Sequence, residues 1–344
     1  MKKLILNWII KSKKSQEVNN ENFKKILLET SWQLGDCIIN SSLLESLAIK
    51  TFNIDVIVRE NSMEMLKYYP YIKNIFPYRS HKNKILRYIN RIVFAIRNRN
   101  KYDIIISFEN EINTFHLLWL KILNGKFVMS LDKKEKYGIK KEDIKIIDYY
   151  FKDKQDILKK LDIDNINYNY KVYLGEYEEL AKYYFDNSKI NVIFNYSGST
   201  ENRVLKPKEV EDILKILVED SKIDLYVSST PKKYHQTEEI ITNLNKDNIK
   251  ILPKTKNIFE IASYIKYSDI VVSVDTSLIH IASAYNKKIL GFYMNDNSTI
   301  EYAKPNCDNY FIVKSKSKER IEDLNQSKIK LNFKKLVELI NDNH

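Results

Sequence analysis

Short apolar runs alternate with helical patterns twice along this chain, and this alternation limits its fold more than any other feature. A helix between two strands returns the chain to the same edge of a sheet, so that the next strand pairs in parallel. The predicted strands occupy residues 24–29, 54–60, 73–78, 102–108 and 126–130, and then 190–196, 223–229, 249–253, 269–274, 287–293 and 309–313. We therefore predict an α/β protein with two Rossmann-like, doubly wound parallel sheets.

Between the strands, apolar residues recur every three or four positions, as they do on the buried face of a helix. The clearest case is 36–51, where Ile39, Leu43 and Leu47 share one face. Further helices are predicted at 62–69, 83–98, 112–123, 143–161, 176–187, 207–219, 232–244, 257–266 and 276–285, and another closes the chain.

The length of the chain favours two domains. At 344 residues it exceeds the usual size of one hydrophobic core. The alternation weakens between residues 131 and 189, where charge-rich stretches replace apolar runs. We predict an N-terminal Rossmann-like domain at 1–165, a C-terminal Rossmann-like domain at 166–325 and a C-terminal helix at 326–344.

The charge balance is basic, with 57 Lys and Arg against 45 Asp and Glu, or +12. The basic residues are scattered, and no zinc-finger spacing or RRM signature accompanies them, so we predict no nucleic-acid partner. Cys37 and Cys307 fit no metal or CxxC pattern. A reducing cytoplasm is the simplest location for such a chain.

The N-terminal stretch MKKLILNWIIKSKK leaves two interpretations open. Its apolar core is too short to span a bilayer, and no small-residue cleavage site follows it. It is either an interfacial anchor, with Trp8 and Ile9 in lipid and lysines at anionic headgroups, or a leader before the first strand. The first interpretation predicts a cytoplasmic protein in peripheral contact with the inner face of the cytoplasmic membrane.

Ligands of doubly wound sheets bind at the carboxyl ends of the strands, so the loops that follow strands are the candidate sites. The first such loop is TSWQLGDCII, residues 30–39. Gly35 permits a turn there, and Asp36 stands at the start of a helix. Asp36 is either a helix N-cap or a carboxylate placed to take a proton from a substrate hydroxyl.

The second loop follows the strand 190–196 and contains Ser197, Gly198 and Ser199. Small residues between a strand and a helix let backbone N–H groups approach an anion, and the helix N-terminus adds partial positive charge. Arg203 and Lys206 are close enough in sequence to supply charge-assisted hydrogen bonds to a diphosphate. The alternative is an ordinary loop with solvated cations. The loop lacks GxGxxG and Walker A patterns, which disfavours NAD and P-loop ATP chemistry.

The third loop, in DIVVSVDTSLIHIASAYNKKILGFY, is the most informative. An apolar strand ends at Asp275, and the helix that follows begins with two hydroxyls, Thr276 and Ser277. His280 lies five residues after Asp275. This arrangement is typical of an anion site. The alternative makes Asp275 an N-cap and His280 a half-buried structural histidine.

Two of these stretches resemble motifs of one family. VDTSLIHIASA resembles the D-[ST]-G-x-x-H-x-A-x-A motif of the heptosyltransferases, glycosyltransferase family 9, and QLGDCIINSSLLESL resembles their N-terminal G-D-x-[ILV] motif. The resemblance extends from about residue 24 to 313, with the motifs in the family's order. It implies the GT-B fold, two Rossmann-like domains that face an interdomain cleft. By this resemblance the domain at 1–165 would bind the acceptor and the domain at 166–325 would bind the nucleotide sugar.

The resemblance also implies an activity: inverting transfer of a sugar from a nucleotide diphosphate sugar, ADP-heptose first, without a metal or cofactor. The acceptor would be a lipid-linked lipopolysaccharide, lipooligosaccharide or capsule glycan. Asp36 would be the catalytic base, beside Gly35 on the acceptor side. The donor-binding candidates are Ser197, Gly198, Ser199, Arg203, Lys206, Ser228, Asp275, Thr276, Ser277 and His280, with Arg203 or Lys206 in place of the family's phosphate-binding lysine.

The chain departs from the family pattern in ways that keep other functions open. Ser277 stands where the motif has glycine, RVLKP replaces the family's lysine before Trp-Pro, and MNDNSTIEYAKPN replaces GPTxP. A sugar other than heptose is therefore an alternative. So are a sugar nucleotide epimerase of the GT-B fold and a non-catalytic protein that binds a nucleotide sugar.

Overall fold

The computed structural model describes residues 23–51, 53–78, 83–109, 113–132, 141–164 and 168–342. The chain divides into two compact units, Met1–Tyr168 and Asn169–His344. The proposed anchor residues Trp8 and Ile9 lie outside the described residues. In the part of the chain that is described, no helix combines the length and the apolar character needed to cross a membrane.

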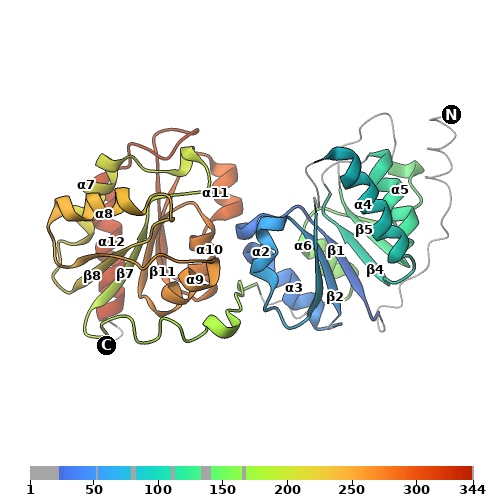
Figure 1. Ribbon diagram of the computed structural model, residues 1–344, viewed down its shortest axis with the longest axis horizontal. Helices are drawn as coiled ribbons and strands as arrows, with labels where there is room; N and C mark the ends of the chain where they lie inside the picture. The colour runs from blue at the N-terminus through green and yellow to red at the C-terminus, as the bar shows by residue number, and fades with distance from the viewer. Residues whose placement is uncertain are drawn as a thin grey trace. The chain divides into compact units, whose positions relative to one another are not determined.

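Unit 1 is built on a six-stranded sheet in the order β3-β2-β1-β4-β5-β6. All neighbouring strands pair in parallel; Ile26 of β1, for example, aligns with Ile54 of β2 and Ile104 of β4. The strands are β1 (Ile26–Glu29), β2 (Ile54–Val58), β3 (Ile72–Pro77), β4 (Ile104–Ser107), β5 (Phe127–Leu131) and β6 (Tyr149–Phe151). Helices α2 (Leu34–Ile39), α3 (Ser41–Ala48) and α6 (Lys154–Lys160) cover one face, and α4 (Lys84–Arg97) and α5 (Thr114–Leu123) cover the other (Figure 1).

Unit 2 repeats this plan with a parallel sheet in the order β12-β11-β10-β7-β8-β9. Its strands are β7 (Ile190–Asn195), β8 (Ile223–Val227), β9 (Ile249–Ile251), β10 (Ile270–Val274), β11 (Lys288–Tyr293) and β12 (Tyr310–Lys314). Helices α7 (Pro207–Leu217), α8 (Tyr234–Leu244) and α12 (Gln326–Asn341) lie on one face, and α9 (Ile258–Tyr267), α10 (Ser277–Ala284) and α11 (Asn297–Ala303) lie on the other (Figure 1). The two predicted doubly wound sheets are confirmed.

The strands are apolar throughout because helices cover both faces of each sheet. All five residues of β10 are buried, although their side chains alternate between the two faces. The C-terminal helix α12 contributes Phe333 and Leu336 to the same core as Phe194 and Phe292 of the sheet. It therefore packs as part of unit 2.

The strand orders place a topological switch point in each unit. In unit 2, β7 lies between β8, which follows it in sequence, and β10, which comes later. In unit 1, β1 lies between β2 and β4 in the same way. The loops that leave two such neighbouring strands diverge, and the space at their carboxyl ends is where doubly wound proteins bind ligands.

Three predicted helices are wrong. Residues 143–161 form the edge strand β6 and then α6, because the run Tyr149–Phe151 pairs with β5 and Asp153 caps a new helix by accepting from the N–H groups of Gln155 and Asp156. Residues 176–187 contain only a 3-10 turn, Gly175–Tyr177, followed by turns. Residues 62–69 form parts of two 3-10 turns, Glu60–Ser62 and Glu64–Leu66, rather than an α-helix.

The second of these segments is fixed by aromatic packing rather than by helical hydrogen bonding. Phe185 is buried, and its ring lies 4.9 Å from that of Tyr226 and 6.2 Å from that of Tyr264. The N–H of Ala181 donates to Ser263 Oγ of α9 at 3.1 Å. Contacts to distant parts of unit 2 therefore outweigh the local helical pattern.

Candidate functional site

The loop after β7 closes on itself around Gly198. The Gly198 N–H donates to the Arg203 carbonyl at 2.9 Å, and Ser197 forms an isolated antiparallel bridge with Val204. A Cβ atom at Gly198 would lie only 2.6 Å from Arg203 Cβ and 3.4 Å from Thr276 Cγ2. Glycine is therefore needed because the backbone passes directly against Arg203. Ser199 lies exposed on the same loop.

Arg203 joins the loops after β7 and β10. Its Nη2 lies 3.3 Å from Asp275 Oδ2, and its Nη1 donates to the Asp275 carbonyl at 3.4 Å. Asp275 is almost fully buried, whereas Arg203 keeps about a third of its side chain exposed (31%). Burial raises the pKa of Asp275, and the nearby Arg203 charge opposes that rise. The contact thus fixes a half-exposed cation at the switch point of unit 2.

Helix α10 begins beside this pair, and Thr276 is its N-cap. The Thr276 hydroxyl accepts from the Leu278 N–H at 3.3 Å, so the interpretation of Asp275 as the cap is wrong. Ser277 is the first helical residue and is half-buried. It is not among the described residues with positive φ, so its backbone does not require glycine. Helix α10 thus begins two residues after Asp275, the partner of Arg203, and a helix N-terminus carries partial positive charge.

His280 lies one turn into α10 and is 4% exposed. Its Nδ1 is buried without a hydrogen-bond partner, and its ring lies 6.1 Å from that of Tyr170 in an edge-on arrangement. Burial, together with the charge of Arg203, lowers the pKa of His280 to about 4. The imidazole is therefore neutral at pH 7, and one of its ring nitrogens has an unmet hydrogen-bonding capacity.

The depressed pKa predicts acid sensitivity of unit 2. Between about pH 6.5 and 4 the unfolded chain binds a proton at His280 that the folded chain does not bind. The stability associated with the neutral His280 is therefore fully present above pH 6.5. The free energy of unfolding then falls by about 3 kcal/mol in total as the pH decreases through the pKa of the folded state. We expect His280→Gln to flatten this dependence, measured by hydrogen exchange of β10 between pH 4 and 7. An unchanged pH slope in the variant would contradict the assignment.

A hydrogen-bonded group of polar side chains lies beneath these loops, and sequence reasoning found only part of it. Asn195 Nδ2 donates to Ser273 Oγ at 2.9 Å and to Thr276 Oγ1 at 3.3 Å, and the Ser228 hydroxyl donates to Asn195 Oδ1 at 3.4 Å. Asn195, Ser228 and Ser273 come from the ends of three neighbouring strands. Asn195 and Ser273 were missed, although a polar residue at the end of an otherwise apolar strand is a usable signal.

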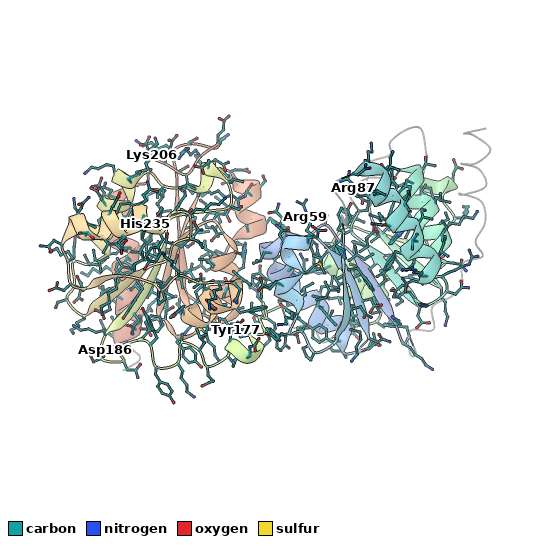
Figure 2. The ribbon with its side chains drawn as sticks, viewed as in Figure 1. Arg59, Arg87, Tyr177, Asp186, Lys206 and His235 are labelled. Carbon is teal, nitrogen blue, oxygen red and sulfur yellow. The ribbon has the colours of Figure 1, made fainter. Side chains whose placement is uncertain are left out.

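Lys206 forms its ion pair with a residue outside this group of polar side chains. It is the N-cap residue of α7, and its Nζ lies 3.2 Å from Glu322 Oε2, with 58% of its side chain exposed. Figure 2 shows it at the surface, where α7 begins. The two cations that the sequence left equivalent therefore have different surroundings: Arg203 contacts Asp275, and Lys206 pairs with Glu322.

In unit 1, Asp36 lies in the first turn of α2, which follows β1. The N-cap of this helix is Gln33, so the N-cap interpretation of Asp36 is wrong. Asp36 is the third helical residue, and its Oδ2 accepts from the Gln33 N–H at 2.9 Å in a capping box. Gly35 directly precedes it within the helix. Asp36 is half-buried and lies near the carboxyl end of β1, the central strand at the switch point.

A buried ionic network lies at the same end of β1 and was not predicted. Glu29, the last residue of β1, is fully buried and pairs with Arg91 of α4. Its Oε2 lies 2.8 Å from His116 Nε2 and accepts from the Ser107 hydroxyl at 2.7 Å. Burial favours the neutral acid, but His116 and Arg91 outweigh burial and hold the pKa of Glu29 well below its usual range.

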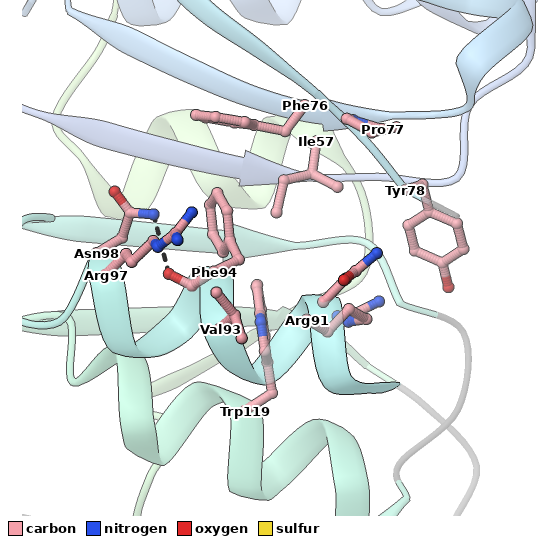
Figure 3. Close-up of a pocket in the computed structure, with 11 residues that line it drawn as sticks. Ile57, Phe76, Pro77, Tyr78, Arg91, Val93, Phe94, Arg97, Asn98 and Trp119 are labelled. Atoms are coloured by element: carbon pink, nitrogen blue, oxygen red, sulfur yellow. Dashed lines mark hydrogen bonds between the residues drawn. The ribbon is translucent and has the colours of Figure 1, made fainter. Parts of the chain in front are cut away.

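Arg91 also lines a cavity of about 350 Å³ in unit 1. The cavity lies between α4 and the ends of β2 and β3, with Phe76, Phe94 and Trp119 among its apolar walls (Figure 3). The Arg91 guanidinium carbon lies 4.6 Å from the Trp119 ring centroid. The residues of this cavity are distinct from all those predicted to bind the donor.

Comparison with known proteins identifies the class. The family model described as glycosyltransferase family 9 (heptosyltransferase) matches residues 94–332, which is more than half of the chain. The chain belongs to this family, and it is a glycosyltransferase. An Escherichia coli (strain K12) protein provisionally named lipopolysaccharide heptosyltransferase 4 is 24% identical over an alignment of 330 residues, and the match covers 86% of this chain and 82% of that protein.

Two solved structures share the fold. The glycosyl transferase family 9 protein from Veillonella parvula DSM 2008 has a TM-score of 0.72 at 13% identity, covering 92% of this chain and 98% of that one. The E. coli ADP-heptose LPS heptosyltransferase II has a TM-score of 0.67 at 15% identity, covering 92% and 99%. The predicted GT-B fold class and family are therefore confirmed.

Proposed function

We propose that the protein transfers a sugar, with heptose as the first candidate, from a nucleoside diphosphate sugar to a lipid-linked glycan of the lipopolysaccharide, lipooligosaccharide or capsule type. The observation that carries the donor assignment is the contact of Arg203 with Asp275 at the switch point of unit 2. It holds a partly exposed guanidinium beside the N-terminus of α10. The charge of the guanidinium and the partial positive charge of the helix end both favour a diphosphate. The names of the relatives support ADP-heptose as the first donor to test.

In the proposed reaction, Asp36 takes the proton of an acceptor hydroxyl as the hydroxyl oxygen attacks the anomeric carbon. The bond from that carbon to the diphosphate oxygen breaks, and the diphosphate leaves with the electron pair. Attack from the face opposite the leaving group inverts the anomeric configuration. Arg203 and the first turn of α10 stabilise the charge that develops on the diphosphate, and the proposal uses no metal ion.

Each donor-side residue has a distinct part in this proposal. Asp275 orients Arg203 through their ion pair, and the surrounding protein fixes the buried Asp275 side chain in place. Thr276 caps α10 and so keeps the first N–H groups of the helix in place. The neutral His280 supplies a hydrogen bond rather than a charge, since its pKa lies near 4. Gly198 lets the loop after β7 approach Arg203.

The donor site is tested by thermal shift with ADP, UDP, GDP, CMP and the matching sugar nucleotides. A ligand at one hundred times its dissociation constant stabilises the folded protein by about 2.7 kcal/mol. We expect ADP and an ADP-sugar to give the largest shifts. If another nucleotide alone raised the melting temperature, that nucleotide would be assigned as the donor nucleotide in place of ADP. If none of the nucleotides or sugar nucleotides raised it, the proposed donor site would be contradicted.

Arg203→Ala is expected to weaken binding of the selected nucleotide by about 10- to 100-fold, because hydrogen bonds to a charged group are lost. Lys206→Ala is the matched control and should change the affinity by no more than about threefold, since its ammonium is exposed and paired with Glu322. Titration calorimetry of both variants measures the difference. If Lys206→Ala weakened nucleotide binding and Arg203→Ala did not, Lys206 would be the residue that binds the diphosphate.

A further inference from the structure

Helix α4 turns its most apolar face toward solvent. Ile85, Ile89 and Ile96 are 68%, 50% and 60% exposed, and Leu86 and Val93 are also exposed. Because residues three and four positions apart share a side of a helix, these side chains form one continuous apolar face. We call this set of five residues the α4 face. A surface helix of a globular protein normally turns such a face toward the core.

The opposite side of α4 holds the helix on unit 1. The Phe94 ring packs 4.8 Å from that of Phe76 and 6.2 Å from that of Trp119, and Ala95 is fully buried. Arg91 reaches through this side to the buried Glu29. The inward side is thus fixed by rings and an ion pair, so the exposure of the α4 face is a consequence of how the helix is anchored.

The charged side chains of α4 and of the residues just after it all have one sign. From residue 84 to 101 the sequence is KILRYINRIVFAIRNRNK, with six basic residues and no acidic ones: Lys84, Arg87, Arg91, Arg97, Arg99 and Lys101. Arg91 is turned inward to Glu29, whereas Lys84 and Arg97 are exposed near the two ends of the helix. Figure 2 shows Arg87 on α4. A partner that complements this surface would offer an apolar region to the α4 face and anionic groups to the basic residues near its ends.

The charge distribution also distinguishes the candidate occupants. A symmetric dimer through α4 would bring the same basic residues of two copies together, because a twofold interface pairs each surface patch with itself. An anionic bilayer offers an apolar interior beneath a layer of negative headgroups, which matches both parts of the surface.

We propose that α4 is an interfacial helix through which the protein docks on an anionic lipid bilayer. The α4 face enters the boundary between headgroups and acyl chains, while Lys84 and Arg97 contact headgroup phosphates. This surface belongs to unit 1 and does not depend on the donor chemistry of unit 2. In the sequence, α4 is also distinct from the N-terminal stretch predicted as a possible anchor.

The test is co-sedimentation of the full chain with vesicles of phosphatidylglycerol and phosphatidylcholine, compared with phosphatidylcholine alone. The triple variant Ile85→Gln, Ile89→Gln and Ile96→Gln removes apolar side chains at exposed positions and keeps good helix formers. We expect its partition coefficient on anionic vesicles to fall about tenfold or more. Binding of the unaltered chain should be weaker without phosphatidylglycerol and should decrease with added salt.

A matched control replaces three exposed apolar residues elsewhere. Ile49, Leu180 and Leu331 are 62%, 49% and 54% exposed, and the variant with Gln at all three should bind vesicles as the unaltered chain does. Unchanged vesicle binding by the α4 variant, or an equal loss in the control variant, would overturn the proposal. So would a dimer in light scattering that only the α4 variant dissociates. The thermal shift with ADP should be the same in all three proteins, so its result separates the donor site from membrane docking.

Discussion

Asp36→Asn is expected to lower sugar transfer by about 10²- to 10⁴-fold while nucleotide binding stays unchanged. Asparagine cannot accept the proton of an acceptor hydroxyl, so the substitution removes general base catalysis from the reaction proposed above. The nucleotide is bound by unit 2 in this proposal, which explains why its affinity should not change. The measurement is the initial rate of transfer with the donor selected by thermal shift, together with the affinity for that donor.

The fold should tolerate this substitution for a reason visible in the structure. Asp36 Oδ2 accepts a hydrogen bond from the Gln33 N–H, and an asparagine Oδ1 can accept the same bond. Asp36→Ala removes the acceptor and should cost about 0.5–2 kcal/mol of stability by analogy with other lost caps. Comparison of the two variants separates the structural role of the carboxylate from its proposed chemical role.

Asp156 provides a closely matched control in the same unit. It is the third residue of α6, it is half-buried, and its Oδ2 accepts from the Lys152 N–H at 2.8 Å. Asp156→Asn therefore makes the same chemical change in the same local setting, and transfer should stay near the rate of the unaltered protein. If Asp36→Asn also retained full transfer, Asp36 would not be the base.

The second large effect concerns stability. Arg91→Met is expected to destabilise unit 1 by about 3–5 kcal/mol, because it leaves the carboxylate of Glu29 buried without its arginine partner. Glu29 is fully buried and Arg91 is 19% exposed, so solvent screens this pair poorly. Methionine keeps much of the apolar stem of Arg91, which limits the loss of packing.

Tryptophan fluorescence can follow this unfolding selectively. The chain has three tryptophans, Trp8, Trp32 and Trp119, and all belong to unit 1. Lys126→Met is the control: Lys126 pairs with Asp103 at 2.6 Å but is 65% exposed, so its loss should cost no more than about 1 kcal/mol. Equal stabilities of the two variants in urea titrations would show that the buried network contributes little.

The motifs of the candidate site could be located from sequence because each lies in one short stretch. Asp275, Thr276, Ser277 and His280 follow one strand, and the prediction that they gather at its carboxyl end needs only the direction of that strand. The sequence could not distinguish the surroundings of Arg203 from those of Lys206. That difference depends on a contact between residues 72 positions apart, Arg203 and Asp275. The chemical roles of these residues stay predictions.

The sequence by itself determined the alternation of strands and helices and the two parallel sheets, because hydrophobic periodicity is local and a crossover helix forces parallel pairing. It also determined the family, through motifs that survive as short ordered strings. Only the tertiary structure decided that residues 149–151 form an edge strand, since that strand exists only where β5 offers it hydrogen-bonding partners.

Which polar side chains pair in the buried networks was also determined only by the tertiary structure. Glu29 meets His116 across 87 positions, and Asn195 meets Ser273 across 78. Local sequence carries no record of these pairings, because each forms only when the loops of neighbouring strands converge at one edge of a sheet. The physical reason is the same in both units: periodicity fixes the elements, whereas the packing of the elements chooses which polar side chains meet.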